Sequence, residues 1–197
     1  AISFYTAPLE VMARLGIIPG SLLMILFPAF SALEGGNEYD KAKMLFARSI
    51  KYLLLIIGPI VTLVLILARD IIKFWLGENF ANNSTVVFQI LAIGFLVNSL
   101  ASVASVFLQG FGRPDITAKL LLLELLFYAP LAWFLISWQG INGAALAWTL
   151  RASVDAFLLF ASSFKIGKIS FLNLTRLGVL RAFTVVSLLA LAGYFVI

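Results

Sequence analysis

Several polar and charged residues interrupt long apolar stretches of this sequence, where such side chains need a partner or a water-filled cavity. An arginine there suits a phosphate or pyrophosphate, because its planar guanidinium group stays charged and donates hydrogen bonds in pairs. A carboxylate there is a candidate for binding a proton or a sodium ion. These residues are Glu10, Arg14, Asn98, Glu124, Arg151 and Asp155.

Glu10 and Arg14 are spaced i, i+4, so they share one face of a predicted helix. Two interpretations are compatible with this spacing. The two side chains form an ion pair that neutralises both charges for insertion, or Arg14 faces a cavity and contacts an anionic ligand.

Arg151 and Asp155 have the same spacing, which predicts either a local ion pair that holds the helices together or a place in a binding cavity. Glu124 has no opposite charge nearby on its own helix. It is a candidate for coupling to protons or sodium, together with Asp155, and the alternative is a pair with Arg151 across a helical hairpin.

Three amides, Gln89, Asn98 and Gln109, lie in one apolar stretch. Their side chains are suited to hydrogen bonding with sugar hydroxyls, although bonds between helices are the commoner use in a membrane. Small residues such as Ser102 and Ser105 lie in the same stretch and predict close packing of helices.

The composition is that of an integral membrane protein. Hydrophobic residues make up 62% of the chain and the mean hydropathy is +1.08, well above the values for soluble domains. The absence of cysteine and histidine removes disulfides, thiolate nucleophiles, imidazole bases and Cys/His metal sites. The net charge of +5 is interpreted as membrane topology, and the aromatic residues are not interleaved with basic ones as a nucleic-acid surface requires.

Apolar runs long enough to span a bilayer predict an all-α membrane bundle of about six helices. The stretch 70–77 is expected to be a short helix lying along the membrane interface, because Ile71 and Trp75 recur at helical spacing between charged residues. Pro8, Pro19 and Pro28 predict that the first helix is bent. The expected spans are 5–33, 44–68, 85–109, 116–138, 141–164 and 177–197.

Basic residues are concentrated in alternate links of this bundle. The links near 34–51, 110–119 and 165–181 hold most of them, whereas the link between the second and third spans contributes Arg69 and Lys73. The positive-inside rule therefore places the three basic links in the cytoplasm of a multi-pass membrane protein. The acidic residues of the first link are expected to form a solvated turn and not a metal site.

Four segments, taken as an ordered set, carry a resemblance to a known family. They are the apolar stretch 5–31 with Pro-Gly-Ser at its midpoint, FWLGENF at 74–80, LQGFGRP at 108–114 and GINGAALAW at 140–148. In this order they resemble the C-terminal lobe of polysaccharide or O-antigen flippases, which belong to the multidrug/oligosaccharidyl-lipid/polysaccharide exporter superfamily. The resemblance implies a fragment that corresponds to the eighth to thirteenth helices of a fourteen-helix transporter.

The resemblance also implies a function: export of an undecaprenyl-pyrophosphate-linked oligosaccharide across the inner membrane by alternating access. Its expected partners are this lipid-linked cargo, the membrane lipids and the missing N-terminal lobe, without nucleic acid and without a cofactor other than a coupling proton or sodium ion. Arg14, Glu10, Arg151 and Asn98 are the expected cavity residues, and Glu124 and Asp155 the expected coupling residues.

Three other functions remain as alternatives. A multidrug or cation antiporter of the same superfamily is expected to use acidic rather than basic cavity residues. A membrane-embedded enzyme is disfavoured, because the sequence has no histidine and no metal-binding motif. A scaffolding bundle would use the buried charges only for stability.

Overall fold

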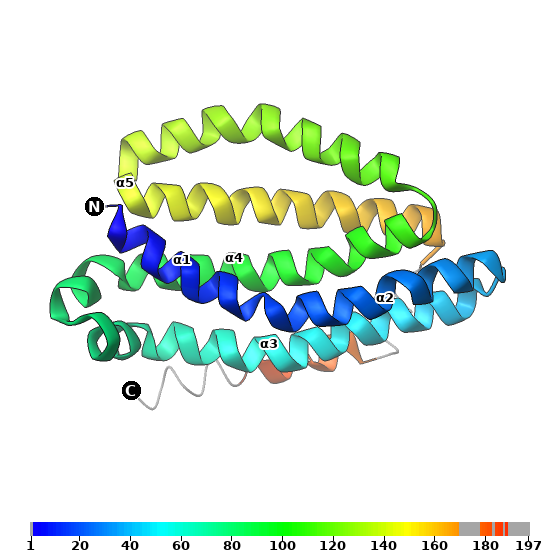
Figure 1. Cartoon of the computed structure of the whole chain (residues 1–197), viewed down its shortest axis with the longest axis horizontal. Helices are drawn as coiled ribbons and strands as arrows, with labels where there is room; N and C mark the ends of the chain where they lie inside the picture. The colour runs from blue at the N-terminus through cyan, green and yellow to red at the C-terminus, as the bar shows by residue number, and fades with distance from the viewer. Residues whose placement is uncertain (1, 170–177, 183, 187, 189–197) are drawn as a thin grey trace.

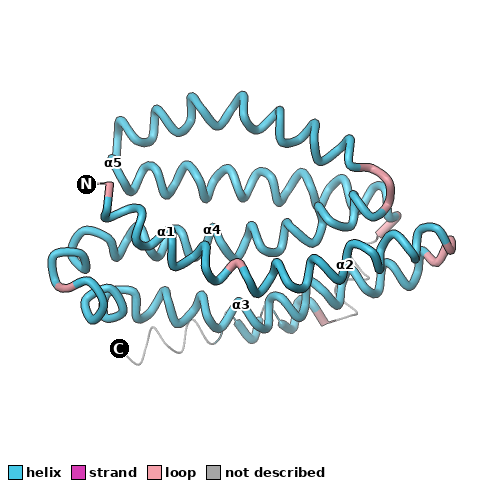
Figure 2. The backbone as a smooth tube through the Cα atoms, viewed as in Figure 1, coloured by secondary structure: helices cyan, strands magenta, loops and turns pink. Residues whose placement is uncertain are grey.

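The computed structural model describes residues 2–169, 178–182, 184–186 and 188. Within these ranges the protein is helical apart from short turns and contains no strand (Figure 2). The expected all-α fold class is therefore confirmed. The helices are α1 (Ser3–Leu15), α2 (Ile17–Gly35), α3 (Tyr39–Leu76), α4 (Glu78–Gly110) and α5 (Pro114–Gly167).

In the described part of the chain, 4 helical stretches are long and apolar enough to cross a membrane. The first of them, Ser3–Gly35, comprises α1 and α2 together. The two helices meet at Gly16, whose backbone N–H donates to the carbonyl of Ala13 at 3.0 Å. Pro19 lies just beyond this point, and a proline ring clashes with the carbonyl four residues earlier, so the bend expected from the prolines occurs here.

Helix α5 is two helices joined at Gly140, where φ is 58° and ψ is −126°. Only glycine adopts this conformation easily. The chain then folds back so tightly that a Cβ atom on Gly143 would lie 1.9 Å from the carbonyl oxygen of Leu135. The result is a helical hairpin, with 116–138 in its first arm and 141–164 in its second.

The structure corrects one expectation about the helices. Residues 70–77 do not form a separate helix, because α3 continues without a break to Leu76 and ends at Gly77, whose φ is 87°. In the sequence, the charges Arg69 and Asp70 interrupt the apolar run and suggest two segments. Charged residues do not interrupt helical hydrogen bonding, and the first helix-breaking residue after Pro59 is Gly77.

The span expected at 177–197 lies largely outside the described residues. Of its described part, 179–182, 184–186 and 188 are helical. Ala182 and Val186 are buried there, and Val186 packs against α3 at Gly58.

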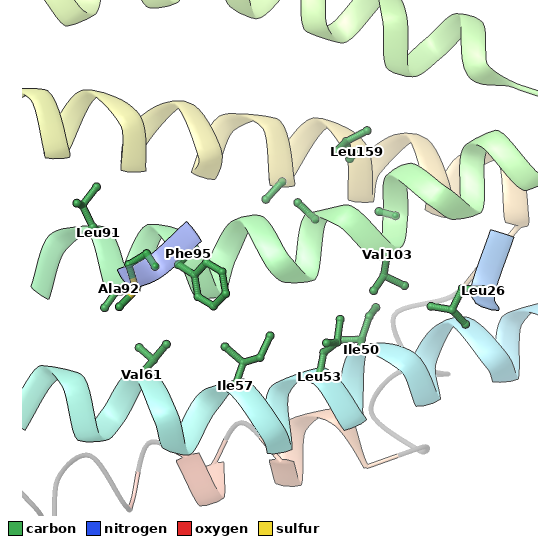
Figure 3. Close-up of a cluster of buried hydrophobic side chains, with 14 of the residues drawn as sticks. Leu26, Ile50, Leu53, Ile57, Val61, Leu91, Ala92, Phe95, Val103 and Leu159 are labelled. Carbon is green, nitrogen blue, oxygen red and sulfur yellow. The ribbon is translucent and has the colours of Figure 1, made fainter. Parts of the chain in front are cut away.

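Helix α4 lies at the centre of the bundle, between the α5 hairpin on one side and α3 with α1 and α2 on the other (Figure 1). The core between α3 and α4 is built from aliphatic and phenylalanine side chains, some of which are drawn in Figure 3. Phe107 of α4 is fully buried and makes edge-on ring contacts with Phe30 of α2 and Phe46 of α3. Lipid tails are as apolar as these side chains, so there is no hydrophobic driving force between helices in a membrane. Close van der Waals packing of this kind therefore holds the bundle together.

The second arm of α5 approaches α4 closely at Gly94. A Cβ atom there would lie 2.6 Å from Thr149 Oγ1 and from the ring of Trp148. Thr149 Oγ1 donates a hydrogen bond of 3.0 Å to the carbonyl of Ile90, and Ser163 donates one of 3.2 Å to Ala104. Small residues and hydroxyl groups therefore set the distance between these two helices.

The turns of the bundle gather at two opposite ends. The turns at 36–38 and 111–113 and the end of α5 lie at the same end, on the right of Figure 1, whereas the α3–α4 turn and Gly140 lie at the other. The first two basic links and the described start of the third, at 165–169, therefore lie at one end of the molecule.

Candidate functional site

Glu124 and Arg151 form an ion pair across the α5 hairpin. Arg151 Nη1 donates to Glu124 Oε2 at 3.4 Å, and the Glu124 side chain is only 4% exposed whereas that of Arg151 is 27% exposed. The second carboxylate oxygen of Glu124, Oε1, is buried without a hydrogen-bond partner among the described residues. The pair is the alternative that the sequence left open for Glu124, and it leaves one acceptor unsatisfied.

The guanidinium of Arg151 also lies over the ring of Tyr128, 5.8 Å from its centroid. Both residues line a pocket of about 220 Å³ between the two arms together with Glu124, and its remaining walls are leucine, valine and phenylalanine side chains. An aromatic ring attracts a desolvated cation, so Tyr128 gives Arg151 a second partner. This positions the charge at the edge of an apolar pocket and not in a polar cavity.

Asp155 lies one turn further along the second arm and belongs to a different cavity. Contrary to the expected local pair, no salt bridge joins it to Arg151 among the residues that the structure describes, because Arg151 turns towards Glu124. Asp155 instead lines a groove of about 330 Å³ between α4 and both arms of α5. The groove also has three hydroxyl groups, of Ser102, Ser105 and Thr117, and the amide of Gln109.

This groove was not predicted from the sequence. The sequence indicates Ser102 and Ser105 only as small residues that let helices approach, and it gives no signal for Thr117. Ser102, Ser105 and Gln109 lie three and four residues apart, so they share one face of α4. This spacing is the signal that could have indicated the groove. The Gln109 amide donates to Ser105 Oγ at 3.1 Å, so two of the polar side chains of the groove are linked.

Glu10 and Arg14 lie elsewhere, on α1. Both are exposed, and both line a shallow pocket of about 290 Å³ with Trp75 at the end of α3. In the described part of the protein no salt bridge of 4.0 Å or less connects them, so the expected ion pair does not form. Their spacing brings them to one face, but an exposed pair gains little from holding two long side chains in one geometry.

Of the three amides, Gln89 has a structural role, since its Nε2 donates a hydrogen bond of 2.8 Å to the carbonyl of Leu65 and joins α4 to α3. Asn98 is half-buried in α4, and its side chain makes no hydrogen bond to another described residue. The six expected site residues are therefore divided. Glu124, Arg151 and Asp155 come together in the α5 hairpin, and Glu10 and Arg14 share a separate pocket.

Comparison with known proteins agrees with this architecture. The family model MatE matches residues 10–134. The chain belongs to the MatE family. This MatE-family chain is also 35% identical, over 158 residues, to a protein of Shigella flexneri named "Putative O-antigen transporter". No solved structure matches it significantly.

The similarity confirms the resemblance to the exporter superfamily that the ordered motifs indicated. With its long apolar helices, this member of the MatE family is a multi-pass membrane protein. The match to the Shigella protein covers 80% of the chain but only 37% of that protein's length. The chain therefore spans little more than a third of that relative.

Proposed function

We propose that the chain is part of a transporter that exports a lipid-linked oligosaccharide, of the undecaprenyl-pyrophosphate type, across the inner membrane by alternating access. The similarity to the Shigella protein named as an O-antigen transporter is the observation that carries this proposal. The proposed role is transport and not catalysis, and the proposed partners are the lipid-linked cargo, the membrane lipids and the rest of the transporter. The basic end of the bundle is the proposed cytoplasmic side.

The polar surfaces of the bundle fit such a cargo in two places. The groove between α4 and α5 offers hydroxyl and amide groups, which can donate and accept hydrogen bonds with sugar hydroxyls. Arg14 is exposed and free of an ion pair with Glu10, so its guanidinium group is available to a pyrophosphate.

The competing function is a multidrug or cation antiporter of the same superfamily. One observation favours it: the charged side chain that lines the groove is Asp155, which attracts cations and not phosphates. The two functions differ in the charge of the cargo, which is anionic for a lipid-linked oligosaccharide and cationic for an antiporter substrate. The experiment therefore compares the two kinds of cargo.

The test is Arg14→Ala in the full-length protein, expressed in cells that depend on it for surface polysaccharide. We expect less polysaccharide at the surface with unchanged abundance in the membrane. Arg48→Ala, which removes another exposed arginine, on α3, is the matched control and should leave export normal. Normal export by the Arg14 variant would remove Arg14 from the cargo path. Loss of resistance to cationic dyes on deletion, with polysaccharide unchanged, would establish the antiporter instead.

Glu124 and Asp155 remain the proposed coupling residues. Oε1 of Glu124, which has no hydrogen-bond partner in the described part of the chain, is the feature that supports a bound proton or sodium ion. Export would be measured under imposed pH or sodium gradients with Glu124→Gln and Asp155→Asn. If neither variant alters the dependence on either ion, the carboxylates have only a structural role.

A further inference from the structure

A pocket at the basic end of the bundle is not used by the proposed transport path. It has a volume of about 380 Å³ and lies between the start of α3 and the end of α5. Its walls are Tyr39, Lys43, Ile166, Gly167 and Lys168. Two lysines therefore face one cavity from helices that are far apart in the sequence.

The fold holds both lysines in place. Lys43 is on α3 with its side chain 21% exposed, and its Nζ bonds Asp40 at 3.0 Å. Lys168 ends α5 in the left-handed conformation, with φ at 48°, and its backbone N–H caps the carbonyl of Phe164.

Asp40 is the carboxylate that pairs with Lys43, and it competes only weakly with an anion bound in the pocket. Its side chain is 97% exposed, so its bond to Lys43 faces water and is a surface ion pair. An ammonium group has three donors, which leaves Lys43 two after the bond to Asp40. Lys168 has no salt bridge within the described ranges.

The remaining walls suit a lipid and not a soluble ion. Ile166 is half-buried and apolar, and Gly167 is buried where its backbone packs on the ring of Phe107. Tyr39 is 42% exposed and lies 6.0 Å from Phe111, ring to ring. A tyrosine with an apolar body and a polar tip is typical of the headgroup level of a membrane.

We propose that this pocket binds the phosphate of an anionic glycerophospholipid, such as phosphatidylglycerol, in the leaflet that the basic end of the bundle faces. Lys43 and Lys168 neutralise the phosphate as point charges, and Tyr39 donates its hydroxyl proton to a headgroup oxygen. The glycerol and the first part of the acyl chains lie along Ile166. The bound lipid ties α3 to the end of α5.

The test uses the purified full-length protein in detergent, with lipid binding measured by native mass spectrometry and by thermal stabilisation. The probes are phosphatidylglycerol, phosphatidylcholine, inorganic phosphate and an undecaprenyl diphosphate. Each lysine near an anionic headgroup contributes about a five-fold gain in affinity, so Lys43→Gln/Lys168→Gln should weaken phosphatidylglycerol binding about 25-fold. The control Lys119→Gln, an exposed lysine near the same end that pairs with Asp115, should leave binding unchanged.

Asp40→Asn separates a binding role from a structural one. It removes the carboxylate that competes for Lys43 and should tighten phosphatidylglycerol binding. If Lys43 only stabilised the start of α3 by pairing with Asp40, the same change would not tighten lipid binding. Equal protection by phosphatidylcholine, or binding that survives loss of both lysines in a folded protein, would overturn the proposal. Protection by inorganic phosphate alone, or by undecaprenyl diphosphate without phosphatidylglycerol, would also overturn it, because it would assign the site to another phosphate. None of these outcomes depends on glycan export.

Discussion

Removing either partner of the Glu124–Arg151 pair should destabilise the bundle, but by unequal amounts. The carboxylate of Glu124 is almost entirely buried, and among the residues that the structure describes Oε1 has no hydrogen-bond partner and Oε2 has only Arg151, at 3.4 Å. Arg151→Gln therefore leaves a buried charge without a countercharge at that distance. Loss of one partner from a buried pair costs about 3–5 kcal/mol in the free energy of unfolding.

The reverse change is milder. In Glu124→Gln, Arg151 keeps its contact with the ring of Tyr128 and is exposed enough to reach water or headgroups. The loss then approaches that of one hydrogen bond to a charged group, about 1.5–3 kcal/mol. The double variant carries no buried charge, so it should be more stable than Arg151→Gln alone.

The assay is reversible unfolding of the full-length protein in mixed micelles, with the abundance of each variant in the membrane as a second readout. Arg48→Gln, a change at an exposed arginine of α3, is the control and should lie within about 0.5 kcal/mol of the wild type. Equal losses for the two single variants, or a double variant whose loss is their sum, would refute the reasoning. Either result would mean that the two side chains are not coupled in the folded protein.

Two further predictions concern the packing of α4. Gly94→Leu should lower the free energy of unfolding by more than Gly94→Ala does, with the alanine change costing about 1–3 kcal/mol, because Thr149 and Trp148 already lie where a Cβ would go; a tolerated leucine in the same unfolding assay would show that the helices are not in contact there. Gln89→Leu should cost about 0.6 kcal/mol, the average for a hydrogen bond between membrane helices, through loss of the bond to the Leu65 carbonyl; an unchanged unfolding midpoint for Gln89→Leu would show that this bond does not contribute to joining α3 to α4.

Prediction from the sequence was most successful where the cause is local. Proline acts on its own helix, so Pro19 indicated a bend that the structure places at Gly16. The boundary expected between the spans 116–138 and 141–164 also has a local cause, because Gly140 makes the turn of the hairpin. The stretch 70–77 is continuous with α3 and not a separate helix, because charged residues do not break a helix, and its place along the membrane interface stays a prediction.

The site depends on contacts between helices, which spacing along one helix does not reveal. The i, i+4 pattern predicted the partners Glu10–Arg14 and Arg151–Asp155, and neither pair forms a salt bridge within the described residues. The hairpin presents Glu124 to Arg151 from the facing arm. A charged side chain inside a membrane bundle pairs with an opposite charge that is also shielded from lipid. For Glu124 that partner is Arg151, 27 positions away in the sequence.

By itself the sequence determined the apolar character of the spans, the bends at proline and glycine, and the concentration of basic residues in alternate links. These features follow from the transfer free energies of the side chains and from backbone stereochemistry, and both depend only on the residues of the segment itself. Only the tertiary structure decided that Ser102, Thr117 and Asp155 share a groove and that Lys43 and Lys168 share a pocket. Those groupings arise from the distance and rotation at which the helices pack, and that geometry is a property of the whole bundle.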